Sequence, residues 1–535
     1  MTAQYRHLGP FSDLVGRLRE VRPLFPRLGR ASSDRLRLLE TIRFTLESEQ
    51  PRDVQLGEKW RSDGCIGEPV SWSVGYGPRT EGWLLRPEGT SSPLPGVLAL
   101  HDHGAFKFFG KEKIANGPSG PSADLSGFRD TYYAGRPFAN ALARQGFAVL
   151  VHDVFLWGSR RFPLDIMPER ERKWAELLNR EFRDASLADE IGLYNVAAML
   201  HENTVEKYCA ALGTTLGAIV SYEDRVAANY LASRPDVIGQ RIGCVGLSGG
   251  GCRAAMLQAT SERISASVIA GMMSTHEDML DQHVANHTWM FFPRGLSQFG
   301  DWPDLAASAA PKGLLVQYLL DDELFPSMGV TNADAIIKTY YRDAGCANRY
   351  VGQFFPGAHR FDLEMQGAAF DWLAAQLGGG SAPYRDQLNR ANAPNLAYRW
   401  RRCVRVNREA FSDLAAVVDG QCRVWTSGPF RLDVAVGISA VGMDCSKGLA
   451  GAVCGSYGAE GRLPRLARRR VIWFFCPMRA SLANQGPIVR YSQCALSRPE
   501  TRSSDGPGPG VREAGSARAR DMWRSFLPSC RGREE

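Results

Sequence analysis

Short apolar runs alternate with helical patterns between about residues 95 and 378. The runs are nearly continuous rather than alternating with polar residues, which is typical of strands covered on both faces. We predict strands at 97–101, 147–153, 242–247, 266–271, 314–320 and 350–355, and helices at 136–145, 222–233, 250–260, 332–343 and 362–377. Strands and helices in this order predict an α/β fold with a mainly parallel sheet.

Three regions fall outside this alternation. Residues 70–89 predict a hairpin that turns at 75–78 and adds antiparallel strands at one sheet edge. Residues 155–221 are mainly helical and lie where a cap over an active site is expected. Residues 1–60 are also predicted to be helical. They could form an arm that packs on the domain or a contact between subunits, and the sequence does not choose between these roles. We therefore divide the chain into a helical arm (1–60), a catalytic domain (61–378, with the 155–221 cap insertion) and an extension (379–535).

The extension differs from the rest of the chain in charge and cysteine content. Residues 385–535 hold 24 arginines, one lysine and 13 acidic residues, a net charge of +12, which leaves −5 for residues 1–384. Seven of the 12 cysteines also lie after residue 400. A basic nucleic-acid arm would mix lysine with arginine and seldom carry scattered cysteines. We interpret the extension as a disordered or non-native segment. A nucleic-acid-binding arm is the alternative interpretation.

The remaining composition narrows the class of protein. The chain has 535 residues, of which 44% are hydrophobic, with no apolar run long enough to span a membrane. The N-terminal residues carry charges every few positions, so they lack the apolar region of a signal peptide. Scattered cysteines without a C-x-x-C pair argue for reduced thiols and against a zinc site. We expect a soluble cytoplasmic protein that binds no membrane, with nucleic-acid binding kept only as the alternative for the extension and a homo-oligomer possible.

The sharpest local motif is Gly246-x-Ser248-x-Gly250, which follows a predicted strand and begins a predicted helix. A sharp strand-to-helix turn exposes the serine hydroxyl and leaves no room for side chains two residues on either side. A phosphate-binding loop would need GK[ST] after the last glycine, but this loop continues with Cys252–Arg253. We predict that Ser248 is a nucleophile.

A serine nucleophile needs a base and an acid that orients the base. Of nine histidines, only His359 follows an apolar strand and precedes the last helix on a loop, so it is the predicted base. Asp322 ends a buried strand and is the predicted acid, with Asp321 in reserve, because successive strand side chains point to opposite faces. Glu277 and Asp278 are alternative acids.

The third requirement is a pair of backbone N–H groups for the oxyanion. We expect one from Gly249, beside the nucleophile, and the other from Ala105, after the turn at Gly104. His101 and His103 form an H-x-H pair that could chelate a metal, but no third ligand is evident. We predict no metal site.

Two residues after the strand at 147–153 are candidates for substrate contact. Trp157 and Arg160 would face the same end of the sheet as Ser248, and they could bind an acidic or sugar-bearing substrate. Arginines in such loops also commonly form salt bridges to a cap, so that alternative stays open.

The motifs HDHGAFKFFGKEK, HDVFLWGSRRFP, GLSGGGCRAA, DDELFP and PGAHRFD occur in this order over about residues 60–378. Together they resemble the α/β-hydrolase superfamily, and most closely its dienelactone hydrolase and acetyl xylan esterase-like branch. The resemblance implies a Ser248–Asp322–His359 triad, with Gly249 and Ala105 as oxyanion donors. It also implies a covalent acyl-enzyme with no metal or organic cofactor. Dienelactone hydrolases use cysteine as the nucleophile, so Ser248 favours an ordinary carboxylic ester.

We therefore predict a serine esterase acting on a small or medium ester. A peptidase or amidase of the same fold shares the triad and is the nearest alternative. A non-catalytic binding protein with this fold is the alternative from another class, because fold alone does not establish function.

Overall fold

The computed structural model describes residues 5–29, 32–181 and 187–378. These residues all belong to one compact unit of the chain. The predicted extension at 379–535 lies outside the described residues, so its character remains a prediction.

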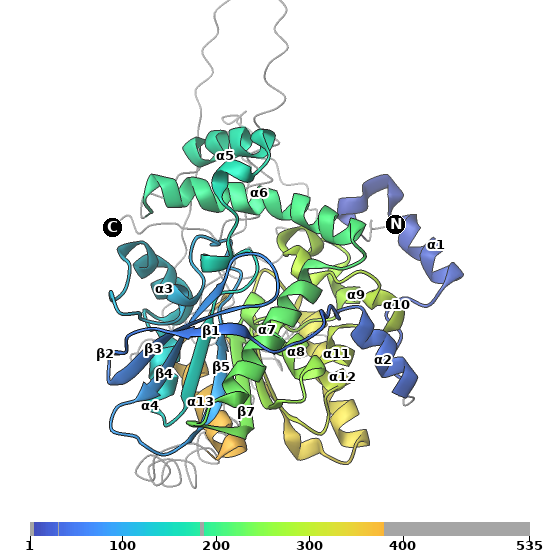
Figure 1. The fold of residues 1–535 in the computed structure, drawn as a ribbon. Helices are drawn as coiled ribbons and strands as arrows, with labels where there is room; N and C mark the ends of the chain where they lie inside the picture. Colours follow the sequence, from blue (N-terminus) through green and yellow to red (C-terminus); the bar gives the residue numbers. More distant parts are fainter. Residues whose placement is uncertain (1–4, 30–31, 182–186, 379–535) are drawn as a thin grey trace, which may run out of the picture. The chain divides into compact units, whose positions relative to one another are not determined.

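A ten-stranded sheet has the strand order β1-β3-β4-β6-β5-β7-β8-β9-β10, with β2 paired to β3 (Figure 1). The strands are β1 (Arg52–Leu56), β2 (Trp60–Ser62), β3 (Cys65–Ser73), β4 (Thr80–Pro87), β5 (Leu94–Leu100), β6 (Ala148–His152), β7 (Val237–Leu247), β8 (Ile264–Ala270), β9 (Gly313–Leu319) and β10 (Tyr350–Phe355). Every pairing from β6 through β10 is parallel, and the pairings on the β4 side are antiparallel. This arrangement is the α/β-hydrolase fold, which confirms the predicted fold class.

The six predicted parallel strands each overlap an observed one, and the predicted hairpin at 70–89 is formed by β3 and β4. Every residue of β6 and β9 is buried. Their continuous apolar sequences are therefore explained by helices on both faces of the sheet.

The helices are α1 (Asp13–Val21), α2 (Ser32–Glu40), α3 (Ser126–Tyr133), α4 (Phe138–Arg144), α5 (Glu169–Glu181), α6 (Asp189–Ala211), α7 (Leu216–Ser233), α8 (Gly249–Thr260), α9 (His276–Met279), α10 (Leu296–Phe299), α11 (Trp302–Ala307), α12 (Ser327–Asp343) and α13 (Leu363–Leu377). Helices α4 and α13 supply Leu142 and Leu373 to the core on one face of the sheet. Helices α7 and α8 supply Val226 and Leu257 to a second core on the other face. Within the described ranges, no helix is both long and apolar enough to cross a membrane.

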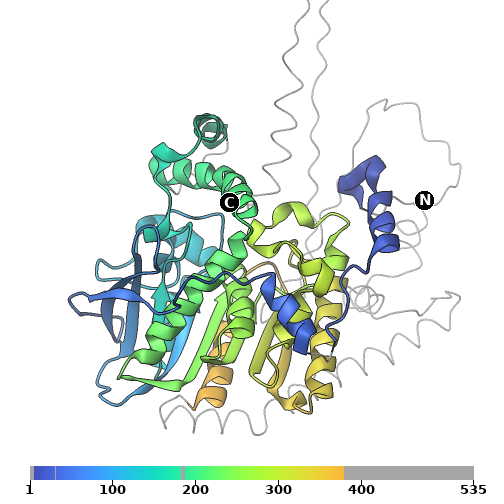
Figure 2. The same ribbon diagram turned by 45° about the vertical axis from the view of Figure 1, so that its right-hand side comes forward.

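Helices α5 and α6 lie together across one end of the sheet (Figures 1 and 2). They come from the 155–221 segment that the sequence singled out as a helical insertion. The insertion ends earlier than expected, because α7 begins at Leu216. The Thr215 side chain accepts the Ala218 N–H and so caps α7 at that point.

The N-terminal segment is helical only in part. Helices α1 and α2 lie in the region predicted to be helical, but β1 and β2 form strands that pair with β3. Every residue of β1 is exposed, so its own polar pattern carried no strand signal. Segment 52–56 is extended because it pairs with the edge of β3 that β4 leaves open. Further upstream, Arg27 forms an ion pair of 3.0 Å with the buried Asp304 and ties this segment to α11.

Candidate active site

Ser248 lies on a sharp turn between β7 and α8, with backbone angles φ 56° and ψ −119°. A positive φ is rare for a residue with a side chain and marks local strain. Steric contacts require glycine at the two flanking positions, 246 and 250. A Cβ on Gly246 would lie 2.4 Å from the Gly250 carbonyl carbon, and one on Gly250 would lie 2.2 Å from the Leu100 oxygen. The G-x-S-x-G spacing therefore reflects close approach of β7, α8 and β5.

His359 and Asp322 are joined by a hydrogen bond of 2.6 Å between His359 Nδ1 and Asp322 Oδ2. Asp322 is buried, and its other carboxylate oxygen accepts the Leu324 N–H at 3.0 Å. Burial alone would lower the pKa of the His359 imidazole, but the Asp322 carboxylate outweighs this effect and raises it. The exposed Asp321 instead accepts the Gly357 N–H, so the structure pairs the histidine with Asp322.

The His359 ring lies close to the end of β8, the strand to which the Ser248 turn is hydrogen-bonded. The Ser248 N–H donates to the Ala270 oxygen at the end of β8, at 2.9 Å. A Cβ on the next residue, Gly271, would lie 3.5 Å from His359 Cε1. Ser248 follows β7, Asp322 follows β9 and His359 follows β10. Since the strands from β7 to β10 are parallel, all three residues lie at the carboxyl end of the sheet.

The loop after β5 lies against the first turn of α8. A Cβ on Gly249 would come within 2.5 Å of the His103 nitrogen. Ala105, at φ 52°, donates its N–H to His103 Nδ1 at 3.1 Å. The N–H that the sequence assigned to the oxyanion is thus bonded to an imidazole. The His103 N–H has no hydrogen-bond acceptor among the described residues, and its nitrogen is the atom nearest to a Cβ placed on Gly249.

The H-x-H pair does not converge on one point. His101 is fully buried, and its Nδ1 is 3.1 Å from the Asp102 oxygen. His103 Nε2 is 2.8 Å from the Glu202 carboxylate. Within the described part of the chain, no group of three or more His, Cys, Asp or Glu side chains could hold a metal ion.

The two candidate substrate residues are both buried. Arg160 is paired with the buried Glu223 and donates to the carbonyls of Tyr76 and Pro78. Arg160 therefore forms a salt bridge, as the alternative proposed, but its partner Glu223 lies on α7 and not in the predicted cap. Trp157 donates its indole N–H to the His103 oxygen at 3.3 Å, so it supports the loop after β5.

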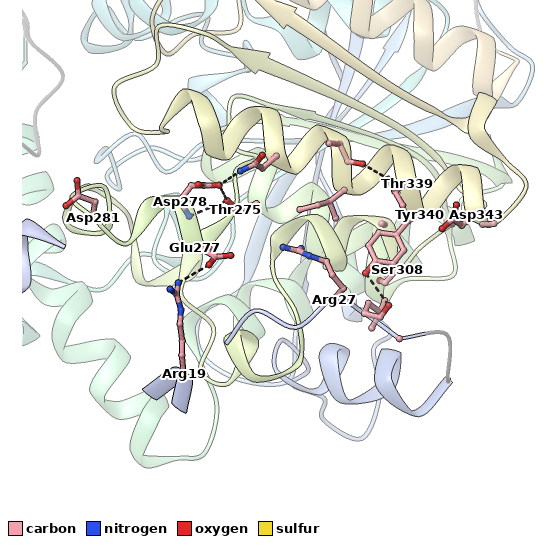
Figure 3. Close-up of a pocket in the computed structure, with 18 of the residues that line it drawn as sticks. Arg19, Arg27, Thr275, Glu277, Asp278, Asp281, Ser308, Thr339, Tyr340 and Asp343 are labelled. Carbon is pink, nitrogen blue, oxygen red and sulfur yellow. Dashed lines mark hydrogen bonds and ion pairs between the residues drawn. The ribbon is translucent and has the colours of Figure 1, made fainter. Parts of the chain in front are cut away.

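The alternative acids line a different part of the molecule. A groove of about 1130 Å³ lies between the N-terminal segment and α9 and α12 (Figure 3). Glu277 pairs there with Arg19 at 2.9 Å, and Asp278 accepts from Thr275 and Asn332. Neither carboxylate is bonded to His359. None of the three predicted triad residues lines this groove.

Sequence reasoning missed the buried charges behind the site. Lys113 is fully buried and contacts Asp102, which also accepts from the Tyr133 hydroxyl. Burial lowers the pKa of Lys113 to about 8. Lys107 is also buried and pairs with Glu202 of α6. A lysine-rich segment normally predicts an exposed surface, so the sequence offered no signal that these ammonium groups point inward.

No family model matches the chain. Over 269 residues it is 23% identical to the Bacillus subtilis (strain 168) protein named Putative hydrolase YtaP, covering 50% of this chain and 74% of that protein. Among solved structures, Methylesterase BT1017 matches at 17% identity and TM-score 0.40, covering 65% of this chain and 62% of the other, less than two thirds of its length. Acetyl Xylan Esterase 1 from Thermoanaerobacterium sp. matches at 15% identity and TM-score 0.37, covering 68% of this chain and 98% of the other. A Klebsiella pneumoniae protein named Putative Dienelactone Hydrolase matches at 15% identity and TM-score 0.35, covering 59% and 99%.

Proposed function

We propose that this chain, whose fold is the α/β-hydrolase fold, is a serine-dependent hydrolase of carboxylic esters. The observation that carries the proposal is the strained Ser248 turn at the same end of the sheet as a His359 imidazole whose Nδ1 is held by a buried carboxylate. A hydroxyl on such a turn, next to an oriented base, is the arrangement that activates serine for acyl transfer.

In the first step, His359 Nε2 takes the Ser248 hydroxyl proton as the serine oxygen bonds to the ester carbonyl carbon. The Asp322 carboxylate accepts a hydrogen bond from the His359 Nδ1–H and stays ionised, which fixes the tautomer and stabilises the imidazolium. The raised pKa of His359 favours this proton uptake. The carbonyl oxygen becomes an oxyanion, which the Gly249 N–H at the start of α8 would bind.

We assign the second oxyanion donor to the loop after β5. The Ala105 N–H is turned to His103 Nδ1, and the His103 N–H lies beside Gly249 with no acceptor among the described residues. We therefore place the second N–H at His103 rather than Ala105.

The tetrahedral intermediate then collapses. The carbon–oxygen bond to the alcohol breaks, His359 donates its proton to the leaving alkoxide, and an acyl-serine remains. Water then attacks the acyl carbon while His359 takes its proton. The bond between the acyl carbon and the serine oxygen breaks, His359 returns the proton to that oxygen, and the carboxylic acid and free Ser248 are released. Every proton is exchanged between His359 and the reacting groups, so the cycle requires no other cofactor.

We assign no substrate contact to Arg160, because its guanidinium is already paired inside the protein. The substrate in this proposal is a small or medium ester. An amide substrate would use the same groups, but His359 would have to protonate a poorer leaving group.

The test is labelling of the full chain with a fluorescent fluorophosphonate, followed by hydrolysis of p-nitrophenyl esters and matched p-nitroanilides. We expect labelling and ester hydrolysis that Ser248→Ala abolishes. Ser265→Ala is a matched control, because its hydroxyl bonds to the Ile242 oxygen at the opposite end of β8. A folded wild-type chain that neither labels nor hydrolyses would exclude the proposed activity, and faster anilide cleavage would favour an amidase.

A further inference from the structure

One face of helix α6 forms hydrogen bonds and an ion pair with the loop after β5. The Asn195 side-chain oxygen accepts the N–H groups of Lys107 and Phe108, both at 2.9 Å. One turn further along, the Ala198 oxygen accepts the Lys107 ammonium at 3.1 Å. Another turn along, Glu202 pairs with the same ammonium. Residues 195, 198 and 202 share a helix face by their spacing, so α6 holds this loop over two turns.

Glu202 is the centre of this contact. One carboxylate oxygen accepts from His103 Nε2 at 2.8 Å and from Lys107. The other accepts from the Thr288 hydroxyl at 2.6 Å and from the Trp289 N–H at 3.0 Å. Burial alone would raise the pKa of Glu202, but Lys107 and then His103 hold it well below its usual value. The carboxylate therefore stays charged and has all four acceptor positions filled.

The His103 imidazole links Glu202 to the backbone of the loop through its two ring nitrogens. Its Nδ1 accepts a backbone N–H, which can only donate, so its Nε2 carries the proton and donates to Glu202. The Trp157 ring packs against the imidazole at 5.2 Å, edge to face. The imidazole is thus fixed from three sides, and with it the His103 N–H beside Gly249.

We propose that Glu202 is a positioning residue, which aims the oxyanion-binding loop through the His103 imidazole. The inference rests on the proposed esterase function. With this role for Glu202, helix α6 contributes to the active site, because a residue of the insertion sets the geometry of the 103–105 loop.

The test is steady-state hydrolysis of p-nitrophenyl acetate by Glu202→Gln in the full chain. A donor displaced by about 1 Å costs on the order of 100-fold in rate, so we expect kcat to fall roughly 10- to 100-fold. We expect KM to change little, since the contact acts in the transition state. Affinity for a trifluoromethyl ketone, which forms a tetrahedral oxyanion on serine, should fall by a similar factor. A purely structural role would lower the thermal midpoint and leave this affinity unchanged.

Glu206→Gln is the matched control, because Glu206 is a buried carboxylate one turn later on α6 that accepts the Leu216 N–H instead. It should retain wild-type kcat and inhibitor affinity. His103→Asn is the second variant, because it leaves the Lys107–Glu202 pair intact and avoids a buried unpaired charge.

Both variants break the same link, so the double variant should lose no more activity than the worse single one. Losses that multiply, or a wild-type kcat in Glu202→Gln, would overturn the positioning role while the esterase proposal stands. An inactive wild-type chain would instead remove the esterase proposal itself.

Discussion

Substituting Gly250 by alanine tests whether the close packing of α8 on β5 sets the geometry of the site. The added Cβ would lie 2.2 Å from the Leu100 oxygen and 3.1 Å from the His101 oxygen, and neither backbone atom can rotate away. Ordinary contact needs about 3.5 Å, so α8 must move by roughly 1 Å from the loop after β5. That movement separates Ser248 and Gly249 from His103, and a 1 Å error of this kind costs about 100-fold in rate.

The expected result is a kcat/KM for p-nitrophenyl acetate about 100-fold below wild type, with a stability loss of roughly 1–3 kcal/mol in urea unfolding. Gly367→Ala is the control. Gly367 lies in α13 with no neighbouring atom within 4 Å of an added Cβ, so alanine should stabilise the helix by about 0.5–1 kcal/mol and leave kcat unchanged. A Gly250→Ala enzyme with wild-type kcat/KM and urea midpoint would refute the argument from contact.

Four further results are expected. Asp322→Asn should lower kcat about 10⁴-fold with the fold intact, because an amide would hold the wrong histidine tautomer; wild-type turnover by this variant would rule out Asp322 as the acid. The acid limb of the kcat/KM profile should lie above pH 6.5, because the pKa of His359 is raised and the base must be neutral; a limb below that value contradicts the role of the Asp322 carboxylate. The same shift should stabilise the fold below pH 6.5, with the contribution lost as the pH rises through the folded pKa, as urea midpoints measured across pH can check. Arg160→Met should lower stability by about 3–5 kcal/mol, because the buried Glu223 loses its counter-charge and keeps only the Tyr76 hydroxyl and the Phe155 N–H as partners. The folded variant should keep its KM, and a raised KM without a stability loss would restore Arg160 as a substrate residue.

The parallel sheet could be predicted because its signal is local. Strands such as β9 are buried on both faces, so nearly every residue must be apolar, and that pattern is visible without the fold. The Ser248 turn was visible for a similar reason, because its glycines are adjacent in sequence and their spacing follows from the turn itself. His359 and Asp322 could be proposed from their order along the chain, although choosing Asp322 over Asp321 required knowing which of two neighbouring carboxylates faces the imidazole.

Tertiary contacts alone decided the surroundings of the site. Strand β1 is fully exposed and forms because β3 offers an open edge, which its own residues do not indicate. The contact between Glu202 and His103 joins positions 99 residues apart, on an insertion and on a loop of the sheet. Lysine side chains are usually exposed, but Lys107 is buried. The Glu202 carboxylate of α6 offsets the desolvation cost of burying its ammonium group. Sequence therefore determined the scaffold and the three candidate catalytic groups, whereas the position of the loop proposed to bind the oxyanion depends on charges that meet only after the chain has folded.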